Sequence, residues 1–540
     1  GHSQRGGEPI EPLVSTQWFL DVSGMAEKAL SALRDGSLKL IPDTFDKTWE
    51  HWLSNIKPWC ISRQLWWGHQ IPAWYDEAGH CYVARSFAEA VELAGTDRLK
   101  QDEDVLDTWF SSGLWPFSTL GWPERTVDLA TFYPTDVLIT GHDILFFWVA
   151  RMVMMGMHLT GEVPFAQVHL TGLVRDEFGD KMSKTKGNVL DPAELVAEYG
   201  ADALRFTLAS LDSPGRDIPL NPKQIAGYRA FGNKIWNAAR FVLSRVGEAK
   251  VAPALDLADL AAPERWILSR LSKVAGEVSE RLAEFRFDEA CNRLYHFFWG
   301  DLCDWYIELS KPALGGEAPR PRVAEVLLSV LDRSLRLLHP VMPFLTEEVW
   351  QRLPGHEAIH PETICLAPYP EREPAWEDAA VEAGMDALIQ AVTRVRAFRA
   401  ELNLPPKVGI DLTLQAEGDT LAELLAGQEP LLAFLCRAEA IAMAPPRPGA
   451  RRDLVAGIEI GVATLEAPVE ALSGGEREKL VKELASLEAE IARAEERLGN
   501  EAFVAKAPPQ VVLGNRRKLA ELHERRERLA ATLGAAGKDA

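Results

Sequence analysis

The chain has 540 residues, of which 47% are apolar, and its formal net charge is −21 at pH 7. A chain of this length and composition can bury several cores, which excludes intrinsic disorder, a collagen-like fibre and a small disulfide-stapled scaffold. The negative charge argues against a general nucleic-acid binder, because sequence-independent affinity for phosphates needs a dense basic surface.

No segment predicts a membrane span. The longest apolar stretch, Ile144–Leu159, is interrupted by Arg151 and is shorter than the roughly 20 residues that cross a bilayer. The first residues show neither a targeting peptide nor an initiator Met, so we expect an N-terminally shortened chain. Six scattered cysteines without a C-x-x-C pair indicate reduced thiols in a cytoplasmic protein and offer no spacing for a zinc site.

Residues 1–45 and 46–220 differ in pattern. Residues 1–45 contain one helical stretch around Met25–Arg34 and no obvious core of their own. Residues 46–220 hold most of the 17 tryptophans, and β-like runs such as Val137–Thr140 and Val168–Val174 alternate with helical segments. This alternation is typical of an α/β fold, in which Trp74–Gly95 has the character of a surface insertion.

Residues 221–405 predict a helical bundle, because strand patterns give way to long amphipathic segments after Asn221. The segments with helical spacing are Ile225–Val246, Pro263–Phe285, Asp288–Leu309, Arg322–His339, Pro343–Leu353 and Val381–Leu402. The proline pair in Leu404–Lys407 cannot continue a helix, so we expect the bundle to end there.

Residues 406–470 predict a small α/β linker domain. Alternating runs at Gly409–Leu414 and Gly457–Gly461 flank a helix near Leu421–Phe434. A loose extension of the bundle is the alternative that this pattern leaves open.

Residues 471–540 predict a coiled-coil arm. A heptad seam runs on both sides of Ala507–Pro509, with Arg526 in one seam position; its apolar members are Leu480, Leu484, Leu487, Ile491, Ala494, Leu498, Leu519, Leu522, Leu529 and Leu533. The short arms and the turn between them favour an antiparallel hairpin over an intermolecular coil. Residues 476–540 carry 13 Lys/Arg and 12 Asp/Glu, a net charge of +1, against −22 for the preceding 475 residues.

The octet Lys181–Asn188, with the sequence KMSKTKGN, is the sharpest motif in the chain. It follows the run Val168–Val174 and a polar hairpin tip, Arg175–Asp180. Two lysines three residues apart on a mobile loop can bring ammonium groups onto the oxygens of a polyphosphate, where charge accumulates as pyrophosphate leaves. A solvated basic turn is the plain alternative for a K-x-x-K sequence.

A second candidate site begins at Gly141. This glycine permits close approach of a ligand to the backbone, and Asp143 can either cap the following helix or hold ribose hydroxyls. Ile144 and Trp148 are four residues apart and share one face of that helix. Packing in a core is the alternative interpretation of these two apolar side chains.

The octet resembles the Lys-Met-Ser-Lys-Ser loop of class I aminoacyl-tRNA synthetases. Four more segments resemble the valine branch of that family, the valyl-tRNA synthetases: Asp104–Pro123, Thr140–Met152, Gly227–Asn237 and Phe503–Pro508. The resemblance covers nearly all 540 residues. It implies a multidomain α/β plus all-α protein with the second half of a Rossmann-type catalytic fold, a helical anticodon-binding domain, a small linker and an antiparallel coiled-coil arm that binds tRNA.

The resemblance also implies an activity and its partners. The family joins L-valine to ATP as valyl-adenylate, with Mg²⁺ helping to neutralise the phosphates, and then transfers the valyl group to tRNA(Val). A cytoplasmic location, a monomeric full-length enzyme and no membrane partner are expected for it.

Site residues follow from the same resemblance. The catalytic residues are Lys181, Ser183 and Lys184, and the valine pocket contains Trp109, Ile144 and Trp148. ATP and the adenylate contact Gly141, Asp143, Leu173, Val174, Lys181, Met182 and Lys184. tRNA contacts Lys223 and Phe241 in the bundle and Arg516, Arg517, Lys518, Arg525, Arg526 and Arg528 in the arm. Core packing is the alternative for Phe241, and a solvated coiled-coil flank is the alternative for the basic cluster.

The sequence departs from the family pattern in several places. No His-x-Gly-His occurs in these residues, so we expect this chain alone to be inactive, and residues 1–45 resemble only the return from the family's editing insertion. Thr185 stands where the family usually has Ser and keeps a hydroxyl. Trp74–Gly79 lacks the cysteines that bind zinc in some relatives, so we expect no zinc site.

Two other functions stay open at this stage. A noncatalytic tRNA-binding protein is disfavoured by the intact lysines of the Lys181 loop, for which a pure binder has no use. An isoleucine–tRNA ligase is disfavoured by the coiled coil and by the segment Leu114–Trp122.

Overall fold

The computed structural model describes residues 1–3, 6–11, 13–183, 186–251, 254–255, 257–258, 260–315, 321–402, 404–405, 408–464 and 474–499, and the single positions 519, 522, 523 and 526. The chain divides into two compact units, Gly1–Met385 and Asp386–Ala540. In the part of the chain that is described, no helix is long and apolar enough to cross a membrane.

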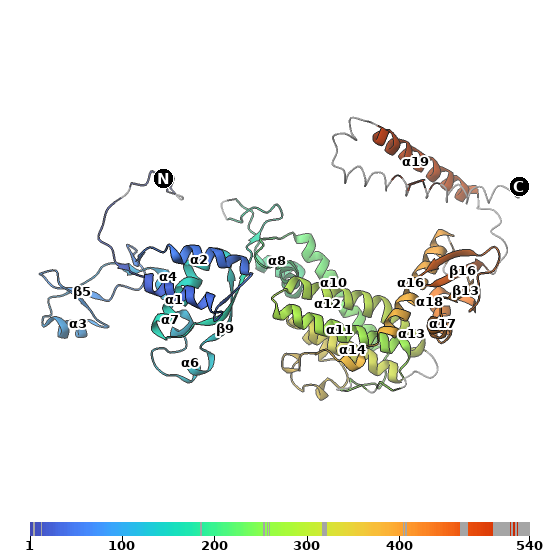
Figure 1. Ribbon diagram of the computed structural model, residues 1–540, viewed down its shortest axis with the longest axis horizontal. Helices are drawn as coiled ribbons and strands as arrows, with labels where there is room; N and C mark the ends of the chain where they lie inside the picture. Colours follow the sequence, from blue (N-terminus) through green and yellow to red (C-terminus); the bar gives the residue numbers. More distant parts are fainter. Residues whose placement is uncertain are drawn as a thin grey trace. The chain divides into compact units, whose positions relative to one another are not determined.

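A three-stranded parallel sheet organises the first unit. Its order is β2 (Lys39–Ile41), β10 (Phe165–Thr171), β9 (Thr135–Gly141), and Val168 of the central strand lies opposite Leu40 and Leu138. Helix α7 (Ala150–Leu159) connects β9 to β10, and α1 (Ser23–Arg34) packs on α7 (Figure 1). This βαβ arrangement is the α/β fold that the alternating pattern predicts.

Residues 1–45 do not form a separate part. Val22, Ala26 and Leu38 belong to the same buried core as Val168 of β10 and Met152 of α7. The apolar stripe of α1 is too small to form a core alone, so it is buried against α7 while β2 pairs with β10. The expected boundary at residue 45 therefore does not separate two folded parts.

The segment expected to be a surface insertion is a small antiparallel unit. It contains β5 (Ala73–Tyr75), β6 (Cys81–Val83), α3 (Phe87–Ala94) and β7 (Lys100–Gln101), with the strand order β6-β5-β7. Trp74 lies at the centre of its small core.

Short elements complete the α/β part of the first unit. The paired strands are β1 (Phe19–Leu20) with β3 (Trp59–Cys60), β4 (Ser62–Arg63) with β8 (Val105–Leu106), and β11 (Val174–Arg175) with β12 (Ile218–Pro219). The helices are α2 (Asp46–Ser54), α4 (Thr108–Gly113), α5 (Trp115–Ser118), α6 (Val127–Phe132), α8 (Pro192–Tyr199) and α9 (Ala201–Leu211).

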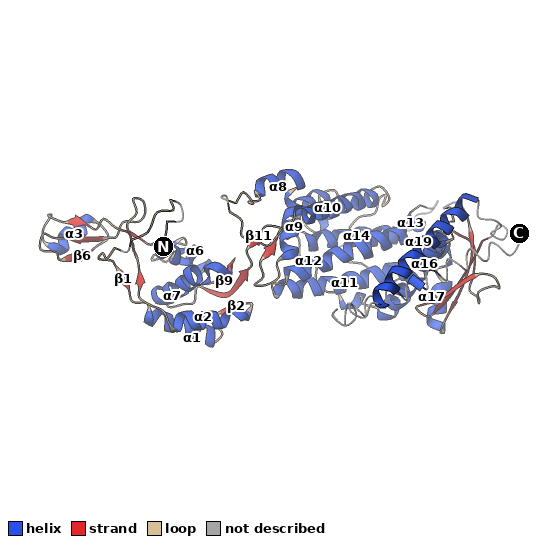
Figure 2. Cartoon of the chain, turned by 90° about the horizontal axis from the view of Figure 1, so that it is seen from above, coloured by secondary structure: helices blue, strands red, loops and turns tan. Residues whose placement is uncertain are grey.

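The predicted bundle helices all occur, within a few residues of their expected ends. They are α10 (Pro222–Leu243), α11 (Ala262–Ala283), α12 (Phe287–His296), α13 (Ile307–Leu314), α14 (Pro321–Leu338), α15 (Pro343–Trp350) and α16 (Ala379–Glu401). Figure 2 shows α10 to α14 side by side, and α12 continues through a π-helical stretch, Phe297–Tyr306, into α13. Trp266, Phe298 and Trp350 are fully buried between these helices.

Helix α9 packs with the bundle although it precedes the boundary expected at residue 220. Phe206 of α9 lies 4.8 Å from the ring of Tyr228 and 5.4 Å from that of Phe231, both on α10. Arg205 of α9 also donates to the backbone carbonyls that follow α14. The α/β part and the bundle consequently share a packed interface within the first unit.

A buried carboxylate, which forms an ion pair within α14, also links this helix to α15. Asp332 on α14 is completely buried, and its carboxylate accepts from Arg336 at 2.6 Å and from Trp350 Nε1 on α15 at 2.7 Å. Arg336 also donates to the carbonyl of Pro368 at 2.6 Å. Removing one partner of such a pair costs about 3–5 kcal/mol, because a charge is left buried without compensation.

The second unit contains the small sheet expected between residues 406 and 470. Its order is β14 (Ala438–Ala442), β13 (Ile410–Ala416), β16 (Ile458–Thr464), β15 (Arg451–Val455), with α17 (Asp419–Ala426) and α18 (Glu429–Cys436) between β13 and β14. Leu412 and Ile460 are fully buried. A four-stranded sheet with its own buried side chains is an α/β domain and not a loose extension of the bundle.

Helix α19 (Gly474–Gly499) forms the first arm of the predicted coiled coil. Leu487 and Ile491 are buried together with Leu522, and Leu519 packs against them. His523 also approaches Glu495, with Nε2 and Oε1 3.1 Å apart. Leu519 and Leu522, two expected seam positions, thus contact α19. The antiparallel coiled coil stays a prediction, because the turn and most of the second arm lie outside the described residues.

Candidate functional site

The carboxyl ends of β9 and β10 bring together the residues expected to contact the nucleotide. Gly141 is the register partner of Thr171, and Leu173 and Val174 follow directly. A Cβ atom at Gly141 would lie 2.8 Å from Asp143 Oδ1 and 3.4 Å from Leu173 Cδ2, so a larger residue would crowd both. In parallel α/β sheets this edge is where ligands bind.

Asp143 stands exposed at this edge. It lies in a 3₁₀ turn, His142–Ile144, whose N-terminus at Gly141 has no side-chain cap. The capping role that the sequence allowed is therefore not observed, and the exposed carboxylate is accessible to a ligand hydroxyl.

A carboxylate that the sequence analysis missed joins several parts of the site. Asp217 Oδ1 accepts from the backbone N–H of Leu173 at 2.9 Å and lies 3.1 Å from His142 Nε2, while Arg175 Nε donates to Oδ2. Leu173, followed by Arg175 and His142, lowers the pKa of Asp217 to about 2. The carboxylate is therefore ionised throughout the physiological pH range.

The Lys181 hairpin, which we define as residues 174–188, emerges from the same edge. Its two sides pair through an isolated antiparallel β-bridge between the backbones of Arg175 and Lys181. Asn188 accepts a hydrogen bond from Ser183 N at 2.9 Å and donates one to Asp176 at 2.8 Å. Asn188 is the main cause of the lowered pKa of Asp176. Lys181 is exposed beside these braces, whereas Met182 and Ser183 are half-buried. Lys184 and Thr185 lie outside the described residues.

Two of the three residues expected in the valine pocket lie on facing elements. Trp109 on α4 stacks near Phe147 with ring centroids 6.1 Å apart, and Trp148 Nε1 donates to the carbonyl of Ser112, also on α4, at 3.3 Å. Trp109, Ile144 and Trp148 are all half-buried.

The regular helix assumed for Ile144 and Trp148 is wrong. Ile144 ends the 3₁₀ turn, and Trp148 lies in a π-helical turn, Leu145–Val149, that precedes α7. The four-residue spacing of an α-helix therefore does not describe this segment. Such π turns are frequent at functional sites, where they change the direction of side chains.

Charged residues lie buried beneath α4. Asp107 caps α4 and accepts from Trp59 Nε1 and Arg63, each at 2.9 Å. Arg151 lies over the Trp59 ring at 3.9 Å, and burial lowers the pKa of its guanidinium to about 10, which Asp107 partly opposes. This cluster fixes the start of α4 and thereby the position of Trp109.

Three parts of the chain match known families. Residues 8–221 match tRNA synthetases class I (I, L, M and V), residues 264–414 match the anticodon-binding domain of tRNA ligase, and residues 474–535 match the valyl tRNA synthetase tRNA binding arm. Valine–tRNA ligase of Brucella suis is 45% identical over 540 residues, which cover 98% of this chain and 58% of that protein. Along nearly its whole length, the chain is thus similar to valyl-tRNA synthetases.

Other relatives show the same similarity. Valine–tRNA ligase of Thermotoga maritima is 45% identical over 542 residues, covering 99% of this chain and 60% of that protein. The chain thus spans 58–60% of the length of these relatives. Among solved structures, Mycobacterium tuberculosis methionyl-tRNA synthetase in complex with methionyl-adenylate is similar, with 19% identity and a TM-score of 0.52 over 64% of this chain and 65% of that one. This likeness shows the class I synthetase fold.

The two anticodon contacts expected for a valyl-tRNA synthetase lie at opposite ends of α10. Lys223 is exposed in the first turn, and Phe241 in the last turn is half-buried near Arg245 and Lys311, whose charged groups lie 5.7 and 5.4 Å from its ring. With a rise of 1.5 Å per residue, about 27 Å separates the two positions. They cannot contact the same base.

Of the six basic residues expected to contact tRNA in the arm, only Arg526 falls in the described part. It is half-buried, as a seam position would be. Arg516, Arg517, Lys518, Arg525 and Arg528 lie outside the described residues.

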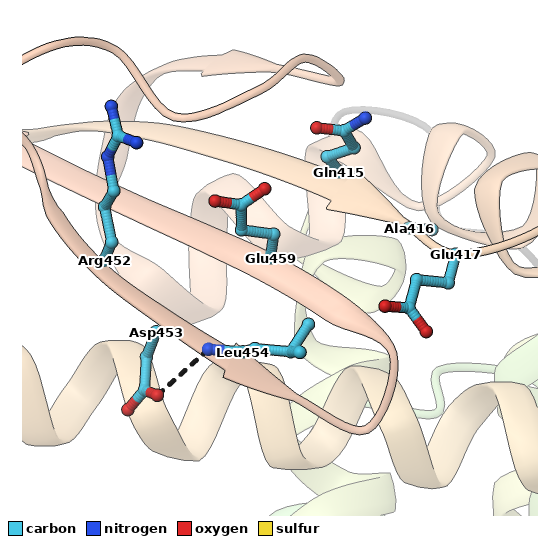
Figure 3. Close-up of a pocket in the computed structure, with 7 residues that line it drawn as sticks. All are labelled: Gln415, Ala416, Glu417, Arg452, Asp453, Leu454 and Glu459. Carbon is cyan, nitrogen blue, oxygen red and sulfur yellow. Dashed lines mark hydrogen bonds between the residues drawn. The ribbon is translucent and has the colours of Figure 1, made fainter.

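A hollow of about 450 Å³ on the sheet of the second unit has the wrong charge for a nucleotide. The strands β13, β15 and β16 and the residue after β13 line it with Glu417, Asp453, Glu459 and Arg452, among others (Figure 3). Three carboxylates and one guanidinium repel a polyphosphate. Across the described residues, no group of three or more His, Cys, Asp or Glu side chains could hold a metal ion.

Proposed function

We propose that these residues serve the valine–tRNA ligase reaction: ATP-dependent activation of L-valine to valyl-adenylate, followed by transfer of the valyl group to tRNA(Val). The observation that carries this proposal is the 45% identity to valine–tRNA ligases along 98–99% of the chain, including the valyl-type arm at residues 474–535.

The nucleotide binds across the carboxyl ends of β9 and β10 in this proposal. The backbone at Leu173 and Val174 receives adenine, and Gly141 and Asp143 receive the ribose, because these four residues share one edge of the sheet. The exposed carboxylate of Asp143 suits a ribose diol, since a carboxylate accepts from both hydroxyls.

Charge placement then drives the first step. The valine carboxylate oxygen attacks the α-phosphorus of ATP, the bond to the bridging oxygen breaks, and pyrophosphate leaves. Lys181, Lys184 and the polar atoms of Met182 and Ser183 stabilise the negative charge that develops on the phosphates. No side chain needs to form a covalent bond with the substrate.

Trp109, Ile144 and Trp148 surround the valine side chain in this proposal. The facing positions of α4 and the π-helical turn support the placement of the two tryptophans. An apolar pocket of this kind separates aliphatic side chains that differ by one methylene by about 1–3 kcal/mol.

For tRNA, we propose two sets of contacts. Lys223 and Phe241 contact different parts of the anticodon loop by charge and by stacking, in agreement with their separation along α10. The basic residues Arg516, Arg517, Lys518, Arg525, Arg526 and Arg528 contact phosphates of the tRNA body.

Magnesium, the location and the oligomeric state complete the proposal. Mg²⁺ would be carried by the ATP phosphates with few protein ligands. The six free cysteines fit a reducing cytoplasm, and we propose a monomer.

The test uses a protein as long as the relatives, with these 540 residues as its C-terminal part. We expect ATP–pyrophosphate exchange that depends on valine, and charging of tRNA(Val). Tight tRNA binding without exchange would establish a noncatalytic tRNA-binding protein instead, and stronger exchange with isoleucine than with valine would establish an isoleucine ligase.

The pocket assignment has its own variant. In the same protein, Trp148→Ala should raise the valine KM and weaken the rejection of larger aliphatic amino acids, because the apolar cavity becomes larger. A thermal melt run in parallel shows whether the variant stays folded. Complete unfolding would make Trp148 a core residue and remove the support for this pocket.

A further inference from the structure

Asp217 joins more separate elements of the site than any other side chain described above, and nothing in the Lys181 motif points to it. We propose that Asp217 is a positioning residue, which holds the turn after β9 and the Lys181 hairpin in one fixed geometry around the nucleotide. This inference rests on the proposed nucleotide site and adds a residue that touches neither substrate nor reacting atoms.

The contacts of Asp217 reach three residues in two segments of the chain. His142 belongs to the turn that carries Gly141 and Asp143, Leu173 follows β10, and Arg175 lies on β11 at the base of the hairpin. The three donors come from positions 42 to 75 residues away along the chain. One carboxylate therefore connects the turn at His142 with the stretch Leu173–Arg175, which follows it only after the whole of α7 and β10.

The backbone around Asp217 packs tightly against the backbone of residues 172–175. A Cβ atom at Gly172 would lie 1.7 Å from the carbonyl oxygen of Arg216, so only glycine allows this approach. Ile218 N donates to Leu173 O at 2.8 Å, and Leu220 N donates to Arg175 O at 3.0 Å. The carboxylate thus has little freedom to move away from its donors.

The other attachments of the hairpin differ in position. Asn188 braces its interior through Asp176, and Asn221 donates to Glu177 at its tip at 3.1 Å. Asp217 is the attachment that also reaches the ribose side of the site, through His142. Loss of Asp217 should therefore leave the hairpin folded but shift it relative to Asp143.

Such a shift is costly for phosphate chemistry. The ribose contacts at Asp143 and the lysine contacts in the hairpin act on two ends of one ligand, and a displacement of about 1 Å can reduce rates by about 100-fold. The pKa of Asp217, lowered to about 2, keeps its charge constant, so its role does not depend on titration near neutral pH.

The experiment replaces Asp217 with Asn, which keeps the shape and an acceptor for Leu173 N but opposes an amide N–H to Arg175. In the protein that is as long as the relatives, we expect kcat/KM for ATP to fall by about 10- to 100-fold while KM for valine changes little. Hydrogen exchange of residues 174–188 in the ligand-free 540-residue chain should become faster. The control Asp180→Asn removes the exposed pair with Lys186 and should change neither quantity.

A paired substitution separates positioning from general stability. Asp217→Asn combined with Arg175→Gln restores a donor and an acceptor across the broken pair, and should recover part of the activity and of the exchange protection. If Asp217→Asn proves too unstable for kinetics, Arg175→Gln alone removes the same pair from the hairpin side and should give the same loss for ATP.

The outcomes judge the two proposals separately. The positioning role would be overturned if Asp217→Asn changed neither the kinetics nor the hydrogen exchange. It would also be overturned if kcat/KM fell equally for ATP and valine and the double variant restored neither. If the unsubstituted protein shows no valine-dependent exchange, the proposed function fails, while hydrogen exchange still tests whether Asp217 holds the hairpin.

Discussion

Lys181 provides the most direct residue-scale test of the proposed chemistry. Its ammonium group is exposed, whereas Lys186 in the same hairpin pairs with Asp180 at 3.6 Å. We expect Lys181→Ala to reduce kcat for valine-dependent pyrophosphate exchange by roughly 100-fold, the scale observed when one transition-state donor is removed. Lys184→Ala should reduce it similarly, which the sequence motif predicts.

The matched control is Lys186→Ala, which removes the same charge from the same hairpin. It should change kcat by less than about threefold, because surface pairs contribute little. Equal effects of Lys181→Ala and Lys186→Ala would mean that the hairpin acts only through its net charge.

The cysteines should react in an order set by burial. Cys81 and Cys365 are exposed, and His339 lies 3.0 Å from Cys365 Sγ, where it can accept the thiol proton. Burial raises the pKa of Cys291, Cys303 and Cys436 to about 12, which keeps these thiols protonated and unreactive at neutral pH.

Labelling with an aromatic disulfide and mass spectrometry of the peptides checks this order. We expect Cys81 and Cys365 to be modified first, with Cys365 slowed selectively by His339→Asn, and the three buried thiols only after unfolding. Early labelling of Cys303 in the folded chain would contradict its buried position.

Some of the site could be predicted from the sequence because its residues are contiguous in motifs. Gly141 and Asp143 share one turn, and Lys181 belongs to a recognisable octet. Asp217 could not be predicted, since its donor His142 is 75 residues away and the pairing depends on the tertiary fold. Arg151 was seen only as an interruption of an apolar run, although it is buried over Trp59.

At the scale of elements, amphipathic spacing predicted the bundle well. The apolar stripe of α11 (Ala262–Ala283) is buried against α12 and α14, so period and burial agree there. The π-helical stretches at Leu145–Val149 and Phe297–Tyr306 could not be predicted, because the spacing of apolar residues does not distinguish a π-helix from an α-helix over so few residues. The parallel pairing of β2 with β10 likewise depends on residues more than 120 positions apart in the chain.

The loop that follows α15 provides an element-scale prediction about pH. Glu377 accepts two hydrogen bonds from Arg372, at 2.7 and 2.9 Å, and one from Ser272 on α11 at 3.1 Å. Arg372 is the main cause that lowers the pKa of Glu377 from 4.5 to about 2. Because the folded-state pKa is depressed, Glu377 stabilises the fold above pH 4.5, and this contribution is lost as the pH falls towards 2.

Thermal melts across this pH range test the prediction with Glu377→Gln. The substitution should lower the melting temperature by roughly 2–4 °C at pH 7 and by progressively less below pH 4.5. The exposed neighbour Glu371 offers a control, since Glu371→Gln should shift the melt little at either pH. If the melting temperature of Glu377→Gln stayed below that of the unsubstituted protein by a constant amount down to pH 2, Glu377 would act through packing and not through its charge.

At the scale of the whole molecule, charge is unevenly distributed along the chain. Residues 476–540 carry a net +1, whereas the preceding residues carry −22. A polyanion as large as tRNA is repelled by most of this chain, so basic segments must supply the attraction. The arm is such a segment, and its small core of Leu487, Ile491 and Leu522 consists of its own residues.

Deletion of residues 474–540 is therefore expected to leave the remaining units folded and to weaken tRNA binding. The basic side chains of the arm would bind phosphates, so affinity should fall for all tRNAs after the deletion. The slope of log K against log salt should become shallower by about 0.7–0.9 for each phosphate that is no longer neutralised. In the protein of full relative length, valine-dependent pyrophosphate exchange should barely change, because that step does not involve the arm.

Binding curves at several salt concentrations, measured beside pyrophosphate exchange, separate the possible roles of the arm. A milder variant with Arg526→Gln should keep α19 and remove one charge, and it should reduce the salt slope by no more than the increment of a single phosphate. An unchanged affinity and slope after deletion would reduce the arm to a packing element. Loss of exchange would show that the arm supports the catalytic fold, which its self-contained core argues against.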